Sequence, residues 1–339
     1  MNKKKGYSHD AFRRRGKRFV NPHLDNARRS LVDITLWQLG FYNDRRLPKE
    51  APKGFKYPNS KRKAKKTTPQ VTWINHCTFL VEVDGLRVLT DPIWSDRCSP
   101  FDFLGPKRRH KPALKMKTLP AIDLVLISHD HYDHLDKKTV HALNERFPTI
   151  TWVVPLGVKK WFEKQGLKHV VELAWWESSS LSFLSHLNLE LKITAVPSQH
   201  FSGRGVFDKN RTLWAGYVVE FKRKKKRLKR LYFVGDTGYN RRDFKAIGKK
   251  FGEMDLSLIP IGTYVPHKFM DPVHIDPKKA VSIHREVKSR LSVGMHWKTF
   301  RLSGEDLDQP PYDLFCMLEK KEIDPKTFRV LNPGQTINW

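Results

Sequence analysis

Cysteine, acidic side chains and long apolar runs are all scarce in this chain of 339 residues. Its cysteines, Cys77, Cys98 and Cys316, are widely spaced and form no C-x-x-C pair, which argues against a disulfide framework and a thiolate zinc site. No apolar run approaches the ~20 residues that span a bilayer, and no apolar segment follows the basic N-terminus as in a signal peptide. We therefore expect a cytoplasmic protein whose only membrane contact is peripheral.

The shortage of acidic residues leaves a formal net charge of +29, from 64 Lys and Arg against 35 Asp and Glu. Such an excess favours anionic partners, namely nucleic acid, an anionic membrane surface or a phosphorylated substrate. A proteome that is basic throughout explains the same charge equally well. The apolar content of 39% indicates a globular chain with a sizeable core.

A change in composition near residue 69 predicts two parts. Residues 1–68 form a basic, proline-punctuated extension, in which 30–42 has the spacing of a short amphipathic helix that either packs on the main domain or lies on a membrane. Residues 69–339 form one domain of alternating β-rich and helical segments. A continuous strand is expected over 71–83, followed by an Asp-Gly hairpin turn. The basic run 222–230 is expected to be a solvated hairpin tip.

The most informative stretch is residues 124–136, LVLISHDHYDHLD. A short run typical of a buried strand is followed within six positions by His129, His131, Asp133 and His134. Three imidazoles and a carboxylate at one turn are costly to assemble unless a cation holds them together. The pattern H-x-H-x-D-H therefore predicts a metal-binding turn.

Three later β-forming runs also end on a potential metal ligand, at His200, Asp236 and His296. Strand ends of layered α/β folds gather at one edge, where ligands bind. Five histidines and two aspartates at such ends predict a two-metal site that Asp236 is suited to bridge. Nitrogen and oxygen donors without thiolate favour two Zn²⁺ ions, with Fe or Mn as alternatives.

The same residues carry a family resemblance. H-x-H-x-D-H followed by a His, an Asp and a His resembles the signature of the metallo-β-lactamase-fold hydrolases. Within them, the chain is similar to the N-acyl-phosphatidylethanolamine-hydrolysing phospholipase D group over about residues 69–339. The similar blocks are LTDPIWSDRCSPFDFLGPKR (89–108), ISHDHYDHLD (127–136), ELAWWES (172–178), SQHFSGRGVFDKNRTLWAGY (198–217), GDTGY (235–239), PIGTYVP (260–266) and HIDPKKAVSIH (274–284). The resemblance implies an α/β fold, an αββα sandwich of two mixed β-sheets flanked by helices, with the metals at one edge.

The resemblance also implies roles for individual residues. One metal would take His129, His131 and His200, and the second Asp133, His134 and His296, with Asp236 between them. Asp133 and His274 would be catalytic, and Tyr132 and His274 would contact the substrate. Weaker candidates near the site are His76, Asp91 and Arg204. The remaining histidines that fall away from strand ends are expected to be structural, namely His141, His169, His186 and His284.

The expected function is that of a phospholipase D-type phosphodiesterase that hydrolyses N-acyl-phosphatidylethanolamine to N-acylethanolamine and phosphatidic acid through a metal-bridged hydroxide. The alternative substrates are a sugar lactone and a nucleic acid phosphodiester, which the same kind of site can hydrolyse. A non-enzymatic binding protein with a degenerate site is a third interpretation, against which the complete set of ligands argues. The expected partners are a phospholipid and an anionic membrane surface. Nucleic acid is less favoured because no basic-aromatic repeat is present. Homodimer formation is left open.

Overall fold

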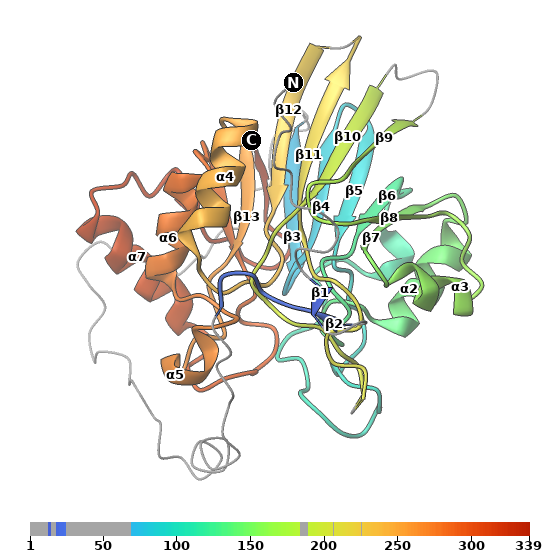
Figure 1. Ribbon diagram of the computed structural model, residues 1–339, viewed down its shortest axis with the longest axis horizontal. Helices are drawn as coiled ribbons and strands as arrows, with labels where there is room; N and C mark the ends of the chain where they lie inside the picture. The colour runs from blue at the N-terminus through green and yellow to red at the C-terminus, as the bar shows by residue number, and fades with distance from the viewer. Residues whose placement is uncertain (1–12, 15–17, 25–68, 184–188, 206, 225) are drawn as a thin grey trace.

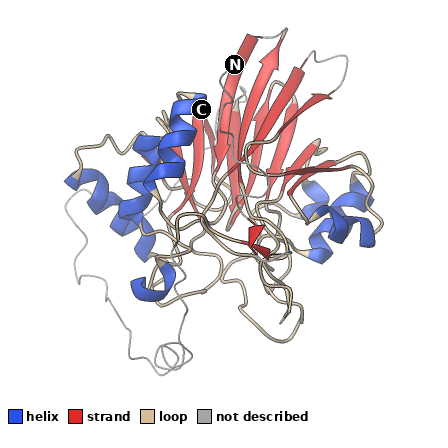
Figure 2. Ribbon diagram, viewed as in Figure 1, coloured by secondary structure: helices blue, strands red, loops and turns tan. Residues whose placement is uncertain are grey.

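Two seven-stranded sheets pack face to face at the centre of the molecule, and helices cover both outer faces (Figure 1, Figure 2). The computed structural model describes residues 13–14, 18–24, 69–183, 189–205, 207–224 and 226–339, so the helix expected over 30–42 lies outside it. This arrangement confirms the expected αββα sandwich.

The first sheet begins with the edge strand β16 (Thr336–Asn338), which comes from the end of the chain. The strands that follow it in space are, in order, β3 (Gln70–Asn75), β4 (Thr78–Val83), β5 (Leu86–Thr90), β6 (Leu124–Leu126), β7 (Thr151–Pro155) and β8 (Val170–Leu173). The Asp-Gly hairpin is confirmed, because β4 and β5 pair antiparallel as far as Val83 and Leu86.

The second sheet carries the later part of the chain. Its strands in spatial order are β15 (Phe328–Arg329), β14 (Ser292–Met295), β13 (Leu256–Pro260), β12 (Lys226–Phe233), β11 (Gly216–Arg223), β10 (Leu189–Val196) and β9 (Ser178–Phe183). The basic run 222–230 lies at the β11–β12 hairpin, whose strands pair as far as Arg223 and Lys226.

Helices α2 (Lys137–Arg146) and α3 (Lys159–Lys164) cover the first sheet, and α4 (Arg241–Phe251), α6 (Pro277–Glu286) and α7 (Gln309–Lys320) cover the second (Figure 1). The short helices are η1 (Met116–Thr118) and α5 (His267–Met270). Two-residue strands β1 (Arg13–Arg14) and β2 (Arg18–Phe19) pair with each other. Helix α6 begins with Asp276 as N-cap, whose side chain accepts the Lys279 N–H, and with Pro277 in the first turn, both residue types that favour these positions.

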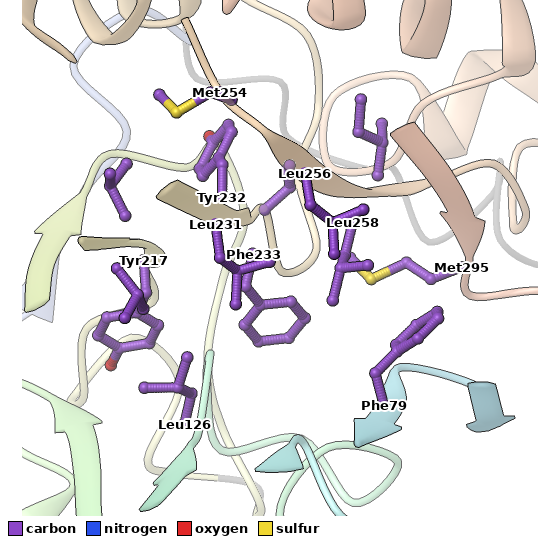
Figure 3. Close-up of a cluster of buried hydrophobic side chains, with 14 of the residues drawn as sticks. Phe79, Leu126, Tyr217, Leu231, Tyr232, Phe233, Met254, Leu256, Leu258 and Met295 are labelled. Atoms are coloured by element: carbon purple, nitrogen blue, oxygen red, sulfur yellow. The ribbon is translucent and has the colours of Figure 1, made fainter. Parts of the chain in front are cut away.

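Alternation along the central strands builds two cores. Val125 and Trp152 face α2 and α3, whereas Leu126 and Val153 face the second sheet. Figure 3 shows Leu126 and Phe79 of the first sheet opposite a cluster from the second sheet that includes Phe233, Leu258 and Met295. Strands buried on both faces need continuous apolar runs, and each fully buried large side chain contributes about 1.5–3 kcal/mol.

The strand directions bring the chemistry-bearing residues to one edge of the sandwich. Strands β5, β6, β7 and β8 are parallel, as are β12, β13 and β14. Strands β3 and β10 each lie two antiparallel steps from β5 and β12, so they run in the same direction as those strands. The residues that follow these strand ends therefore meet at what we call the metal edge. The tip of the β11–β12 hairpin lies at the opposite end of the sheets (Figure 1).

The single strand expected over 71–83 is wrong, because the structure divides it into β3 and β4. Asn75 pairs with Thr78, and the chain reverses at His76, whose φ is 43°. No glycine, proline or aspartate marks this turn in the sequence. The reversal moves His76 from the middle of a strand to the metal edge.

Candidate metal centre

The H-x-H-x-D-H turn connects β6 to α2 and is held from two sides. Ser128, at its start, donates its backbone N–H and its hydroxyl to the Asp91 carboxylate at 2.7 and 2.5 Å. On the other side, Nη1 of Arg204 donates to the carbonyl oxygens of Asp130 and Leu135, both at 2.7 Å. These contacts fix the turn independently of any bound ion.

Three histidines bring their ring nitrogens together at this turn. Nε2 of His129 lies 2.8 Å from Nδ1 of His131, and Nε2 of His200 lies 3.3 Å from the same atom. The other nitrogen of His200 donates to the Val273 carbonyl at 2.8 Å, and that of His129 lies 2.9 Å from Ser128 Oγ, whose own proton goes to a carboxylate. In His129 and His200 these contacts place the proton on Nδ1 and leave a lone pair on Nε2, the nitrogen that faces His131.

A second cluster lies beside the first and combines imidazole with carboxylate. Nδ1 of His134 donates to Asp91 Oδ2 at 2.6 Å, and Nδ1 of His296 lies 3.1 Å from Thr263 Oγ1. Their Nε2 atoms lie 3.2 and 3.0 Å from Oδ2 of Asp236. Each ring is therefore oriented from behind, and its free nitrogen faces the shared carboxylate.

Asp236 and Asp133 complete the arrangement. Oδ2 of Asp236 also lies 3.8 Å from Nε2 of His200, so this carboxylate reaches both clusters. Asp133 Oδ2 lies 3.2 Å from Nε2 of His134 and 3.0 Å from Nε2 of His76. All seven residues expected to ligate metal are thus brought together.

Unpartnered buried atoms show whether these residues fit a cation. Five side-chain atoms in and beside the two clusters are buried without a hydrogen bond, namely Nε2 of His134, Nε2 of His296, Oδ1 of Asp236, Nδ1 of His274 and Nδ1 of His76. A buried polar atom without a partner costs about 1–3 kcal/mol. Five such atoms at one place, amid converging lone pairs, fit a pair of divalent cations.

The pKa values differ between the two clusters. Burial lowers the pKa of His129 and His200 well below the usual value, so these rings are neutral and ready to bind metal. Burial acts the same way on His134 and His296, but the nearby carboxylates, Asp236 above all, outweigh it and raise the pKa of His296 to about 9. Metal binding to the second cluster therefore has to displace protons, so the affinity falls as the pH falls.

His274 lies beside both clusters. Its Nδ1 is 3.8 Å from Oδ2 of Asp236, and its ring centroid is 5.1 Å from that of His200 and 5.4 Å from that of His296. Burial lowers the pKa of His274 to about 3, so the ring is neutral and can still donate an N–H. This placement agrees with the expected contact between His274 and a substrate.

Tyr132 is held by the loop that follows His200. Its hydroxyl donates to the carbonyl oxygen of Arg204 at 2.9 Å, and the Arg204 guanidinium lies 4.0 Å from the centre of its ring. Within the described residues, both the hydroxyl and one face of the ring are therefore already in contact with Arg204. Its role as a substrate contact stays a prediction.

The backbone is strained where it lines the site. Positive φ angles occur at His76 (43°), Asp91 (31°), Thr263 (68°) and His296 (60°). Such conformations cost about 1–3 kcal/mol each outside glycine and cluster at functional sites. They lie at the residues that follow β3, β5, β13 and β14 at the metal edge.

The histidines expected to be structural lie away from the metal edge where the structure describes them. His141 is exposed on α2 and contacts Gln165, His169 is exposed, and His284 bonds to Ser292 in the core. His186 lies outside the described residues.

Sequence reasoning missed two residues that orient ligands. Thr263 supports His296, and Asn21 bonds both backbone groups of His200. Thr263 follows a β-rich run, and this position after a strand is the only sign in the sequence that its side chain lies at the metal edge. Asn21 and His200 are 179 residues apart, and no local pattern connects them.

Comparison with known proteins agrees with this geometry. Residues 86–297 match the family model of the β-lactamase superfamily domain. A metal-dependent hydrolase structure from Veillonella parvula, described as possible, covers 80% of this chain and all of its own at 17% identity, with a TM-score of 0.59, which supports the fold. The chain therefore belongs to the β-lactamase superfamily and is a metal-dependent hydrolase of that fold.

Within this superfamily the chain is similar to a particular group of enzymes. It is 42% identical over 271 residues to N-acyl-phosphatidylethanolamine-hydrolyzing phospholipase D 1 of Caenorhabditis elegans, covering 78% of this chain and 74% of the relative. It is 33% identical over 249 residues to the mitochondrial enzyme of that name from Saccharomyces cerevisiae, covering 73% of this chain and 51% of the yeast protein.

Proposed function

We propose that this hydrolase is a phospholipase D-type phosphodiesterase that converts N-acyl-phosphatidylethanolamine into N-acylethanolamine and phosphatidic acid. The observation that carries the proposal is a set of seven His and Asp side chains that could hold two metal ions, in a chain 42% identical to a curated enzyme with that substrate in its name. The proposed cofactors are two Zn²⁺ ions, with Fe or Mn as alternatives because the donors are nitrogen and oxygen.

The chain's own residues divide the work of the proposed reaction. Two cations held by the seven candidate ligands would supply Lewis acidity toward a phosphoryl oxygen and would lower the pKa of an attacking water. His274, neutral and 3.8 Å from Asp236, is placed to donate a hydrogen bond to a phosphoryl or leaving-group oxygen. Asp133 is proposed to accept the proton of the water, because its Oδ2 faces the ligand nitrogens of the second cluster.

The net charge of +29 keeps a nucleic acid phosphodiester as a second candidate substrate, and the site chemistry equally suits a sugar lactone. A panel assay with metal-loaded protein separates the three. The substrates are N-acyl-phosphatidylethanolamine, a sugar lactone, and single-stranded DNA and RNA.

The decisive measurement is the reaction in ¹⁸O-labelled water with mass spectrometry of both products. Attack of water on phosphorus places the label in phosphatidic acid and leaves N-acylethanolamine unlabelled. We expect Asp236→Asn to abolish this activity. Asp123→Asn is the matched control. Asp123 directly precedes β6, at the end of the strand away from the metal edge, and its carboxylate accepts the backbone N–H of Arg87 in β5. Turnover of lactone or nucleic acid, with none of the lipid, would overturn the proposal.

A further inference from the structure

Large apolar side chains that are exposed to solvent occur, among the described residues, in two loops only. Phe101, Phe103 and Leu104 are 51%, 79% and 60% exposed in the loop that follows β5, and Phe207 is 79% exposed in the loop that follows His200. Single exposed apolar residues are ordinary, but a group with no partner marks an interaction surface.

Both loops are attached to the metal-binding turn. Asp102, between the two phenylalanines, lies 2.6 Å from Nζ of Lys138 in the first turn of α2. In the other loop, Gly203 donates its backbone N–H to Asp130 at 2.8 Å, and Thr212 donates its hydroxyl to the same carboxylate at 2.7 Å. These contacts tie both loops that carry the apolar tips to the metal-binding turn and to the first turn of the helix that follows it.

The loops also hold their shape through internal contacts. Nε of Arg97 donates to the carbonyl oxygen of Asp102 at 3.1 Å, and Nη1 donates to that of Gly105 at 2.5 Å. Asp208 accepts the backbone N–H groups of Arg204 and Gly205 at 3.0 and 2.8 Å. These hydrogen bonds fix the backbone of both loops in a conformation that leaves the phenylalanine side chains exposed.

Positive charge accompanies these tips. A hollow of about 710 Å³ at the end of β7, on the same edge, is lined by the cationic Lys159, Lys160, Lys164 and Arg211 and by the acidic Glu163 and Glu172. Lys107, Arg109 and Lys209 are exposed in or beside the two loops. Aromatic tips surrounded by basic side chains match the acyl boundary and the anionic headgroups of a bilayer.

We propose that the Phe101–Leu104 and Phe207 tips, with the basic side chains beside them, form a docking face that sets the metal edge against an anionic bilayer. This inference rests on the proposed lipid substrate and adds where and how the membrane is met. It excludes the β11–β12 hairpin as the principal anchor. That basic tip is a strand length, roughly 23 Å, from the end of β12 and lies at the opposite end of the sheets (Figure 1).

The test is co-sedimentation of the full chain with vesicles of phosphatidylcholine and phosphatidylserine, which needs no turnover. We expect Phe103→Ser combined with Phe207→Ser to weaken binding at least ten-fold. Arg223→Ser combined with Lys226→Ser, at the hairpin tip, is the matched control and should change binding less than three-fold. Unchanged binding of the phenylalanine variant, or a ten-fold loss in the hairpin variant, overturns the proposal.

Two further measurements separate the alternatives. On a short-chain N-acyl phospholipid below its micelle concentration, the phenylalanine variant should keep wild-type activity, because no bilayer is involved. Loss of that activity would place the tips in substrate binding and overturn docking. Absence of hydrolysis by the wild type would reject the proposed function while leaving the sedimentation result to decide on docking.

If sedimentation velocity shows that the substitutions dissociate a dimer and leave vesicle binding intact, the face binds a second copy and the proposal fails.

Discussion

Asn21 holds His200 through both of the latter's backbone groups. Its side-chain N–H donates to the His200 carbonyl oxygen at 2.7 Å, and its side-chain oxygen accepts the His200 N–H at 3.1 Å. Phe19, two residues earlier, is buried in the core between the sheets and exchanges hydrogen bonds with Asn210. A short piece of the N-terminal region thereby positions a candidate metal ligand.

This contact predicts that Asn21→Ala weakens metal binding. Residues that orient a ligand typically change metal affinity by 10–100-fold, and we expect roughly ten-fold here because only the backbone of His200 is held. Competition with a chromophoric chelator measures the effect. Asn240→Ala is the control, because it removes the N-cap of α4 and so costs stability without touching the site. Equal metal affinities of Asn21→Ala and the wild type would show that the two hydrogen bonds from Asn21 to His200 are not needed for metal binding.

Asp91 supports the second cluster in the same way. It accepts the Nδ1 proton of His134 and both donors of Ser128, so replacing it by asparagine leaves at least one donor facing another donor. We expect Asp91→Asn to lower the affinity for one ion by about 10–100-fold. Elemental analysis after dialysis against a weak chelator measures the loss, and Asp123→Asn should retain the wild-type content. Retention of both ions by Asp91→Asn would contradict this role.

The fold, and the gathering of the seven candidate ligands at one edge, could be predicted because their signals are local. Each ligand of the second half follows its own β-forming run, and the sheet order then brings His200, Asp236 and His296 to the edge that His129 already marks. The hairpin at Asp84 and the caps of α2 and α6 follow equally from residue type.

The remaining features depend on contacts that no periodicity reveals. Trp73 to Thr78 contains a single turn-forming residue, Asn75, among residues typical of strands, so the sequence signal is weak and the turn at His76 is set by pairing of the finished strands. The docking of Asn21 depends on a partner far along the chain. The apolar tips at Phe103 and Phe207 lie in irregular loops, where sequence alone does not separate exposed from buried aromatic residues.

His284 predicts a pH dependence of stability that is independent of the metals. It is buried on α6, bonded to Ser292 Oγ at 2.8 Å and stacked on Phe328, and burial lowers its pKa from 6.5 to about 4. Between these values the unfolded chain binds a proton that the folded chain does not. Stability is therefore retained above pH 6.5 and lost as the pH falls toward 4, by about 2 kcal/mol between pH 7 and 5.

Urea unfolding at pH 7 and pH 5 measures this loss against His284→Gln, which cannot titrate. The variant should lose about 2 kcal/mol less than the wild type over this interval, and contributions from the metal site cancel in the difference. His141→Gln, on the exposed side of α2, should keep the wild-type slope. An identical pH dependence in His284→Gln and the wild type would assign the effect to other groups.

The position of Asp236 between the two clusters predicts that it is needed for binding two metal ions and for the stability that this binding adds. Its Oδ2 lies within 4 Å of His200 in one cluster and of His134 and His296 in the other, so this one side chain connects the two clusters. We expect two ions per wild-type chain and fewer than two in Asp236→Asn. At a metal concentration about 1,000 times Kd, binding contributes roughly 4 kcal/mol per ion, so chelation of both ions should lower the Tm of the wild type by about 10 °C. The shift on chelation should be clearly smaller in Asp236→Asn and unchanged in Asp123→Asn, as measured by calorimetry alongside elemental analysis. Two ions retained by Asp236→Asn, with a full shift in Tm, would mean that the clusters bind metal independently and that the carboxylate between them is not a bridge.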